Sequence, residues 1–469
     1  MPAPAVFWFR RDLRLLDHPA LSAAVEEGRG RVVPLFVVDP RLTAPAGPTR
    51  VDFLRRSLDS LNTDLGGTLT VRSGSPVTVI PEVAREAGAR AVVATRDYGP
   101  YGRERDLAVR DALAAHSIEL RLVDSPYLVA PGTVVGEAGR PLKVFTAFRR
   151  RWENELSEET SELPANIDWV SLPSEGTSSL LSGASTKRPW YFGDLPTPVA
   201  PSPPLAGETH ARQLLVDFAR RVDTYDEIRN LPGRDETSRL SPYVKVGAIH
   251  PRRVLAACSG SSTGAAVLRS ELGWREFYAD VLWHQPQSVR DDLQPGLRHL
   301  AVDRDDAAAD RFSYWARGET GFPLVDAGMR QLALEGWMHN RVRMVAASFL
   351  VKHLHLDWRW GARWFMWNLV DGDVASNQHG WQWAAGTGTD AAPFHRIFNP
   401  TRQAERFDPD GEYIRRYVTE LRDVTAPACW APSGGTGLLA APGYATAMID
   451  LDTERREALA RFAAARGAS

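Results

Sequence analysis

Cysteine is scarce in this chain, which holds Cys258 and Cys429 among its 469 residues. Two cysteines allow no disulfide framework and no cysteine zinc site, and this usage is typical of a reducing compartment, so we expect a cytoplasmic location. The 11 histidines include no pair with the spacing of a zinc motif. We therefore expect no metal site.

Long apolar runs and a secretion signal are also lacking. No uninterrupted apolar run approaches the length of a membrane span, and the N-terminus lacks the basic-then-apolar pattern of a signal peptide. A hydrophobic share of 43% and a charged share of 24% exclude a disordered chain and indicate an ordinary soluble, globular protein. A length of 469 residues predicts two or three domains, because a single core rarely organises so many.

An excess of either charge is absent, since 56 basic residues face 58 acidic ones and the formal net charge is −2. The overall charge therefore gives no sign of nucleic-acid binding. If the protein binds DNA, the binding face must be a local patch.

The first part of the chain alternates between strand and helix patterns. Its first strand runs into Arg10-Arg11-Asp12, so the GxGxxG fingerprint of dinucleotide-binding folds is absent. The alternation predicts an α/β domain, Rossmann-like, in which helices cover both faces of a parallel sheet. We expect strands over 6–9, 32–38, 69–71, 91–94 and 119–123, and helices after Asp17-His18-Pro19 and over 51–65 and 81–86.

The second part changes to a helical period after a long stretch rich in Ser, Pro, Gly and Thr, residues 155–208, which we expect to be a surface connection. Ten of the 15 tryptophans lie between Trp274 and Trp383. We expect an all-α domain, with its clearest helices over 213–226, 271–283, 325–355 and 361–370. The predicted domains are therefore 1–130 (α/β), 131–210 (connection) and 211–469 (helical).

A candidate phosphate site lies where Thr237, Ser238 and Arg239 precede Ser241-Pro242. Consecutive hydroxyls, a cation and a helix start together suit a phosphate. The alternative is an ordinary capping turn, and this segment alone leaves both open.

A second candidate lies in the helix around Glu271, where Trp274, Arg275 and Tyr278 fall on the same stripe. A buried stripe that mixes a carboxylate, an indole and a guanidinium is costly unless it is partnered, so it suits a pocket for a flat ligand. An amphipathic interface helix is the alternative.

Residues 336–344 also suit a ligand pocket. We expect them to be helical, and one side of the helix would carry Trp337, Asn340, Arg341 and Met344. Arg343 turns away and is expected to form a buried pair with Asp371, which is better evidence of a site than of stability.

Taken together, these segments resemble the photolyase/cryptochrome family, most closely its class I cyclobutane pyrimidine dimer photolyases. The resemblance covers residues 4–430, in the family's order and roughly its spacing. The motifs are FWFRRDLR (7–14), TSRLSP (237–242), WREFY (274–278), GFPLVDAGMR (321–330), WMHNRVRM (337–344), DGD (371–373) and WQWAAGTGTDAAPFHRIFNP (381–400).

The resemblance implies a U-shaped FAD inside the helical domain. Arg343 with Asp371 and Asp373 would hold its isoalloxazine region, Arg275 would enclose it, and Asn377 would sit beside the flavin N5. The implied FAD-binding residues are Tyr225, Thr237, Ser238, Arg239, Leu240, Ser241, Arg275, Asn340, Arg343, Asp371, Asp373 and Asn377.

The resemblance further implies that the protein repairs UV-damaged DNA with light, by electron transfer from excited, reduced FAD to a flipped-out dimer. A damaged pair stacks poorly, so it is flipped at lower cost than normal bases. Trp274 and Trp383 would stack on it, at about 1–3 kcal/mol per base, and Glu271 would stabilise its anion. The implied lesion-binding residues are Glu271, Trp274, Asn340, Arg341, Met344, Trp383 and Arg396. Histidines, which the related (6-4) photolyases place at 340 and 344, are absent.

Family members reduce their flavin through three tryptophans, and Trp381 and Trp358 match the inner two. The outer one should lie about ten residues before Trp315, where the chain reads Asp303-Arg304-Asp305-Asp306. Either another donor such as Tyr314 or Trp360 replaces it or light-driven reduction is poor, so we expect slow photoreduction.

The segment from Asp97 to Asp106 resembles the subgroup whose antenna is 8-hydroxy-5-deazaflavin. The folate-binding subgroup prefers an Asn-Glu pair where this chain has Tyr101-Gly102, but methenyltetrahydrofolate or an empty pocket stays open. The antenna candidates are Arg11, Phe36, Asp39, Arg50, Asp97 and Lys245.

Three functions remain open at this stage. Light-driven DNA repair by a monomer that binds no membrane is favoured. A cryptochrome-type blue-light receptor without repair is the alternative, although only about 40 residues follow Trp430, which leaves little room for a signalling tail. A flavin oxidoreductase would need a second substrate motif, which the sequence lacks.

Overall fold

The computed structural model describes residues 2–157, 160–163, 166–177, 188–391, 393, 396–432, 441 and 443–467. His395, which belongs to one of the family motifs, lies outside the described residues. The chain divides into two compact units. Unit 1 comprises Met1–Lys187, Pro204–Asp223 and Ser238–Pro286, and unit 2 comprises Arg188–Pro203, Thr224–Thr237 and Gln287–Ser469. This grouping does not test the domain boundaries expected from the sequence, so those boundaries stay a prediction.

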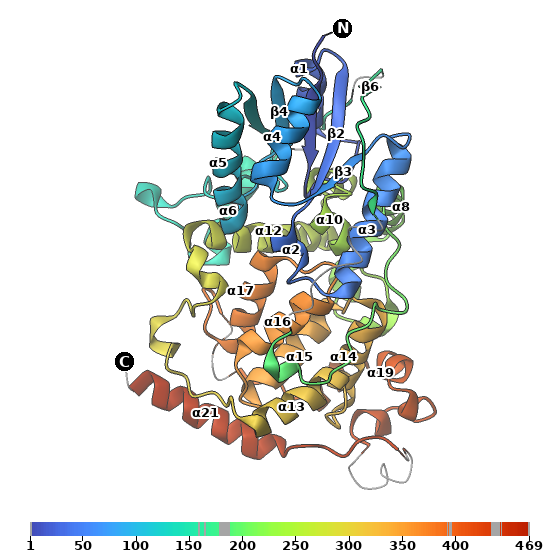
Figure 1. Ribbon diagram of the computed structural model, residues 1–469. Coiled ribbons are helices and arrows are strands. Elements are labelled where there is room, and N and C mark those ends of the chain that lie inside the picture. Colours follow the sequence, from blue (N-terminus) through green and yellow to red (C-terminus); the bar gives the residue numbers. More distant parts are fainter. Residues whose placement is uncertain are drawn as a thin grey trace. The chain divides into compact units, whose positions relative to one another are not determined.

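Unit 1 is built on a parallel sheet in the order β3-β2-β1-β4-β5, with the short β6 also paired to β2 (Figure 1). The strands are β1 (Ala5–Phe9), β2 (Arg31–Val38), β3 (Thr70–Ser73), β4 (Ala91–Thr95), β5 (Glu119–Val123) and β6 (Asp168–Trp169). All five strands expected from the sequence are present, and the expected fold class, α/β followed by a helical domain, is confirmed.

Alternation along β1 explains how helices cover both faces. Phe7 and Phe9 pack into one core cluster with residues of α1 and α3, whereas Val6 and Trp8 pack into another with residues of α4 and α5. Successive strand side chains point to opposite faces, so a fully buried strand serves two cores.

Proline opens most of the helices of unit 1, at a position where its missing N–H is not needed. The helix predicted after residue 17 is α1, but its N-cap is His18, not Asp17. The helices are α1 (Pro19–Glu27), α2 (Pro40–Thr43), α3 (Pro48–Asp64), α4 (Pro76–Glu86), α5 (Pro100–Ala114), α6 (Phe145–Trp152), α8 (Glu208–Ala219), α10 (Ser241–Val246), α11 (Pro251–Ala257) and α12 (Thr263–His284).

Unit 2 is helical around one large hydrophobic cluster that contains Trp315, Trp358, Trp367 and Trp381. Its helices are α9 (Tyr225–Ile228), α13 (Asp306–Arg317), α14 (Pro323–Glu335), α15 (Asn340–Lys352), α16 (Trp358–Asn368), α17 (Val374–Ala385), α18 (Pro400–Phe407), α19 (Glu412–Tyr417) and α21 (Leu451–Gly467). Among the described residues after β6 there is no strand, only an isolated bridge between Asp303 and Leu356.

Four helix predictions were wrong in their extent. The helix expected over 81–86 begins at Pro76, and the helix expected over 271–283 begins at Thr263. The helix expected over 213–226 begins at Glu208 and ends at Ala219. The helix expected over 325–355 is two helices, because Gly336 adopts a left-handed conformation (φ 64°) that ends α14. Glycine reaches this region without strain, and it is a common helix terminator.

Within the described residues, none of the helices is both long and apolar enough to cross a membrane.

Candidate functional site

A bidentate ion pair joins α15 to the segment before α17. Arg343 Nη1 and Nη2 lie 3.2 and 2.8 Å from the two carboxylate oxygens of Asp371, and Arg343 Nε donates to Met338 O. The Asp371 side chain is 3% exposed and that of Arg343 is 24% exposed. The pair that the sequence predicted is therefore present, in the fork geometry that only arginine provides.

Asp373 and Asn377 lie on the first turn of α17. Asp373 caps this helix by accepting a hydrogen bond from Ser376 N at 3.1 Å. Asn377 donates through Nδ2 to Ala362 O and to Gln378 Oε1. These two bonds use both amide hydrogens, so the amide oxygen is left as the group that can accept a hydrogen bond from a ligand.

Four of the five lesion residues predicted in unit 2, all except Arg396, lie on two helices that pack against each other, α15 and α17. Asn340 and Met344 are one turn apart on α15, and Trp383 is half-buried near the end of α17. The spacing of one helical turn places Asn340 and Met344 on one face.

Arg341 is positioned by partners that the sequence did not reveal. Its Nε and Nη2 both donate to Asn230 Oδ1, at 3.2 and 2.7 Å, and its guanidinium lies 4.3 Å from the centroid of the Phe407 ring. Asn230 and Phe407 are far from Arg341 in sequence, so no local pattern could have identified them.

Trp337 does not lie on α15, contrary to the prediction of one continuous helix. It belongs to the non-helical segment between Gly336 and the N-cap His339. The prediction that one helix side carries Trp337 together with Asn340, Arg341 and Met344 is therefore wrong for Trp337. The helical side begins at Asn340.

Arg396 is exposed, and its backbone oxygen accepts a hydrogen bond from the buried Lys352 Nζ at 2.9 Å. Burial, and then the nearby Arg396 guanidinium, lowers the pKa of Lys352 to about 8. Lys352 thus fixes the backbone at Arg396, whose exposed side chain suits contact with a phosphate.

The predicted phosphate segment turns sharply before α10. Arg239 has a left-handed backbone (φ 48°), Leu240 is the N-cap, and Ser241 opens the helix. Ser238 Oγ accepts from Leu240 N at 3.4 Å. Tyr225 and Thr237 belong to unit 2, whereas residues from Ser238 onward belong to unit 1.

Glu271, Trp274 and Arg275 lie in unit 1, on α12. Trp274 stacks on Phe145 with ring centroids 3.8 Å apart and planes inclined by 14°. Arg275 Nη2 donates to Pro126 O at 3.1 Å, and its guanidinium covers the Tyr127 ring at 4.4 Å. The prediction that Glu271 and Trp274 face the same lesion as Trp383 stays a prediction.

The neighbouring Glu276 is a structural anchor that sequence reasoning missed. Its carboxylate is 2% exposed and accepts from Leu128 N, from Val129 N at 2.9 Å and from Trp152 Nε1 at 2.7 Å. Burial raises its pKa, against the opposing effect of Arg275. Glu276 thereby ties α12 to the 126–129 loop that Arg275 also contacts.

Trp381 and Trp358, the two inner tryptophans of the predicted chain, both lie in the core of unit 2. A Cβ at Gly361 would come within 2.1 Å of the Trp381 ring, so glycine is required for this close approach to α16. Trp358 Nε1 donates to Asp292 Oδ1 at 2.8 Å.

Polar residues occupy the outer tryptophan's place. Asp305 caps α13 by accepting from Ala308 N at 2.8 Å, and Asp303 pairs with Arg311 and Arg461. Of the two alternative donors, Trp360 stacks on Tyr191 at 4.3 Å, and Tyr314 is 47% exposed beneath Arg317.

The antenna candidates lie in unit 1. Asp39 follows β2 and accepts from Tyr101 OH, while Asp97 follows β4 and pairs with Arg105 Nη2 at 3.2 Å. Burial opposes ionisation of Asp97, but Arg105, Arg10 and Arg11 outweigh it and lower its pKa. A Cβ at Gly102 would meet Asp97 within 2.2 Å, so a side chain there would displace this carboxylate. The remaining candidates are Phe36, which is buried, and Arg11, Arg50 and Lys245, which are half-buried.

Two buried polar atoms test whether an FAD fits. Within the described part of the chain, Thr237 Oγ1 and Trp381 Nε1 are buried without a hydrogen-bond partner. Buried polar groups are normally satisfied, so such atoms call for a ligand or an ordered water. A hydroxyl beside the Arg239 turn and an indole N–H in the helical core fit a ligand with phosphates and a polar ring system.

The chain matches two family models. Residues 5–166 match the model described as "DNA photolyase", and residues 267–464 match the "FAD binding domain of DNA photolyase".

Relatives match over almost the full length. The chain is 39% identical to "Deoxyribodipyrimidine photo-lyase" of Halobacterium salinarum, over 98% of this chain and 99% of the relative. It is 40% identical to the protein of that name from Streptomyces griseus, over 99% of both chains.

Solved structures are similar as well. A bacterial class III photolyase from Agrobacterium tumefaciens has a TM-score of 0.89 and 36% identity, covering 100% of this chain and 98% of that one. A Synechocystis cryptochrome has a TM-score of 0.85 and 28% identity, covering 98% and 99%. With nearly complete coverage at these identities, the chain belongs to the DNA photolyase family.

Proposed function

We propose that this enzyme binds FAD and repairs cyclobutane pyrimidine dimers in UV-damaged DNA with light. The observation that carries the proposal is the packing of α15 against α17, with Asn340, Arg341 and Met344 on one helix and Trp381 and Trp383 on the other. These side chains suit a damaged base pair, since they offer an amide, a guanidinium held by Asn230, a thioether and an indole for stacking.

Arg343, Asp373 and Asn377 would hold the isoalloxazine region of FAD. Arg343, held by Asp371, offers a fixed cation, Asp373 offers a carboxylate, and the oxygen of Asn377 offers an acceptor. Thr237, Ser238 and Arg239 would bind its phosphates. When bound and reduced, FAD supplies the electron that opens the cyclobutane ring on illumination, and the electron returns, so that no net redox change occurs.

The protein's own part is to position the lesion, exclude water and stabilise charge. Trp274 and Trp383 would stack on the dimer, and Glu271 would donate a hydrogen bond to a pyrimidine carbonyl as negative charge develops there. A protonated Glu271 would be needed for that bond. Arg396 would hold a phosphate of the flipped strand.

Two substitutions separate these roles. Glu271→Ala should lower the yield of repair per absorbed photon more than it lowers affinity for a dimer-containing oligonucleotide. Trp274→Ala should chiefly weaken binding, by about 1–3 kcal/mol. Binding is measured in the dark and repair by release of intact thymines under blue light. If the two effects are exchanged, the roles are assigned to the wrong residues.

A cryptochrome-type receptor without repair is the second candidate, because a solved cryptochrome shares the fold over nearly the whole chain. Dark binding of dimer-containing DNA followed by light-dependent release of thymines supports repair. If the protein does not bind damaged DNA and light does not change the lesion, the receptor function is favoured. The class I assignment also stays a proposal, since a class III photolyase is among the similar structures.

We also propose that the carboxyl ends of β2 and β4 hold an antenna chromophore, 8-hydroxy-5-deazaflavin. Asp39 and Asp97 are linked there through Tyr101 and Arg105, and ligands of open parallel sheets bind at such ends. An absorption spectrum of the native protein distinguishes a deazaflavin from a folate.

A further inference from the structure

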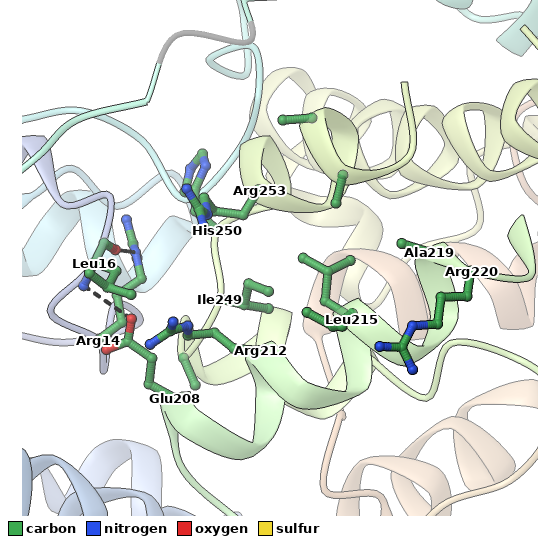
Figure 2. Close-up of a pocket in the computed structure, with 14 residues that line it drawn as sticks. Arg14, Leu16, Glu208, Arg212, Leu215, Ala219, Arg220, Ile249, His250 and Arg253 are labelled. Carbon is green, nitrogen blue, oxygen red and sulfur yellow. Dashed lines mark hydrogen bonds between the residues drawn. The ribbon is translucent and has the colours of Figure 1, made fainter. Parts of the chain in front are cut away.

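A cavity of about 520 Å³ lies within unit 1, and none of the residues predicted to bind FAD, the lesion or the antenna is among its lining residues. Its walls come from the segment 14–16, from α8 and from α11 (Figure 2). This volume lies in the range of small-molecule sites.

Arginines surround the cavity. Arg212 and Arg220 lie two turns apart along α8, and Arg253 comes from α11 (Figure 2). Among the residues that the structure describes, the side chains of Arg212 and Arg253 have neither a hydrogen bond nor an ion pair, and both are exposed. Arg220 is 75% exposed and lies 3.5 Å from Asp217. The cationic groups are therefore largely available to a ligand.

Glu208 is the single acidic residue among the described lining residues, and its carboxylate is already engaged. Its two oxygens accept from Leu15 N at 2.7 Å and from Leu16 N at 3.1 Å. Figure 2 shows the second of these bonds. Burial raises its pKa, although these bonds and Arg14 oppose that change. Glu208 thus secures the segment 14–16 and does not neutralise the arginines.

Arg14 and His250 make the deep part of the cavity positive or neutral. Arg14 is 3% exposed and donates to three backbone oxygens, those of Leu16, Asp17 and Gly247. The His250 ring lies between Ser125 O and Arg252 N, and burial, followed by Arg14 and Arg252, holds its pKa well below the ordinary value. At this end Arg14 contributes a positive charge, and Glu208 is the one carboxylate among the described lining residues.

The rest of the lining is apolar. Leu16 is 40% exposed and Val216 is 49% exposed, and they continue into Leu215, Ala219 and Ile249. Covering exposed apolar surface stabilises a complex by roughly 25 cal/mol per Å². The occupant that matches both features has an apolar body and a negative group.

We propose that this cavity binds a small organic anion, with its carboxylate or phosphate between Arg212 and Arg253 and its apolar body against Val216 and Ile249. The size of the cavity favours a small molecule over a peptide helix. The site is independent of the proposed repair activity.

The test is calorimetric titration of the full-length, flavin-loaded protein with phenyl phosphate. Inorganic phosphate and phenol each carry one half of the proposed chemistry, so each should bind at least about tenfold more weakly than phenyl phosphate. Arg212→Gln and Arg253→Gln should each weaken binding about tenfold, and Val216→Asp should abolish it. All three residues are exposed, so the variants should fold, which a thermal melt checks.

Arg110→Gln is the matched control, because Arg110 is an exposed arginine of α5 that does not line the cavity. The proposal is overturned if wild-type protein does not bind phenyl phosphate or if the three cavity variants bind like the control. Equal binding of inorganic phosphate or of phenol overturns it as well. If undamaged duplex DNA displaces phenyl phosphate, the cavity belongs to a nucleic-acid-binding surface and the proposal is overturned. If only an acidic peptide binds, the cavity belongs to a protein-docking surface and the proposal is overturned as well.

Discussion

Two buried carboxylates, one in each unit, are held in different ways. In unit 1, Asp106 is paired with guanidinium groups: it lies 2.6 Å from Arg10 and 2.9 Å from Arg105, all with side chains about 5–6% exposed. In unit 2, Asp326 is fully buried and is held by neutral donors, namely Thr320 N and Oγ1, Gly321 N and Tyr444 OH.

The difference appears in the directions of the pKa shifts. Burial would raise the pKa of Asp12, but the nearby His18, Arg10 N and Thr95 OH bring it to about 2. Burial raises the pKa of Asp326 and of Asp408, and the hydrogen bonds from neutral donors only reduce that rise. Asp12 in unit 1 therefore keeps its charge although it is buried, whereas at Asp326 and Asp408 in unit 2 burial outweighs the neutral donors and opposes ionisation.

Guanidinium pairs occur in unit 2 as well: Arg304 and Arg359 hold the buried Asp357, and Arg343 holds Asp371 in the candidate flavin site. A buried pair of this kind is weak evidence of stability and better evidence of a site. These differences lead to four predictions.

The largest effect is expected for Asp106→Asn. It removes the carboxylate shared by Arg10 and Arg105 and leaves two buried cations, so the free energy of unfolding should fall by about 3–5 kcal/mol. Urea denaturation measures this. A loss below about 1 kcal/mol would show that Asp97 alone balances these arginines.

Asp12→Asn should show a pH-dependent effect. Because the folded pKa of Asp12 is depressed to about 2, its contribution is complete above the ordinary pKa and is lost as the pH falls toward 2. The difference in unfolding free energy between wild type and variant should therefore be constant above pH 5 and narrow by up to about 2 kcal/mol on acidification. A difference that widens at low pH contradicts the assignment.

Asp326→Asn should cost less, about 1–2 kcal/mol at neutral pH, because an amide replaces only part of the hydrogen bonding. The raised folded pKa gives the opposite pH dependence. Wild-type protein gains stability as the pH falls through that pKa, so the difference from the variant should widen on acidification. Measuring the unfolding free energy of Asp12→Asn and Asp326→Asn in parallel over the same pH range compares the two buried carboxylates directly.

The smallest effect on stability is expected for Arg343→Gln, about 1 kcal/mol in the FAD-free protein, because this guanidinium is 24% exposed and the glutamine amide can still donate a hydrogen bond to the buried Asp371 carboxylate. Flavin retention after gel filtration should nevertheless fall strongly. Arg317→Gln is the control, since this arginine also pairs with a carboxylate but lies on the exposed side of α13. Unchanged flavin content in Arg343→Gln would remove this pair from the proposed site.

Local chemistry determined much of the molecule. Apolar runs located the five strands, a proline marked the start of the first helix, and the Arg343–Asp371 pair was anticipated from the sequence. The starts of α3 and α4 at Pro48 and Pro76 were missed. The break at Gly336 was missed because α14 and α15 face the same core, so their apolar spacing continues across the turn.

Only the tertiary structure decided which distant groups complete each site. Asn230 holds Arg341, Phe145 stacks on Trp274, and Glu276 reaches the 126–129 loop, although nothing near these residues in the chain marks them. The same is true of the arginine-lined cavity, whose walls are three separate segments. Periodicity and capping act over a few neighbouring residues and can therefore be recognised in the sequence. A distant partner of a charged side chain, such as Asn230 for Arg341, is set by the packing of elements that lie far apart in the chain.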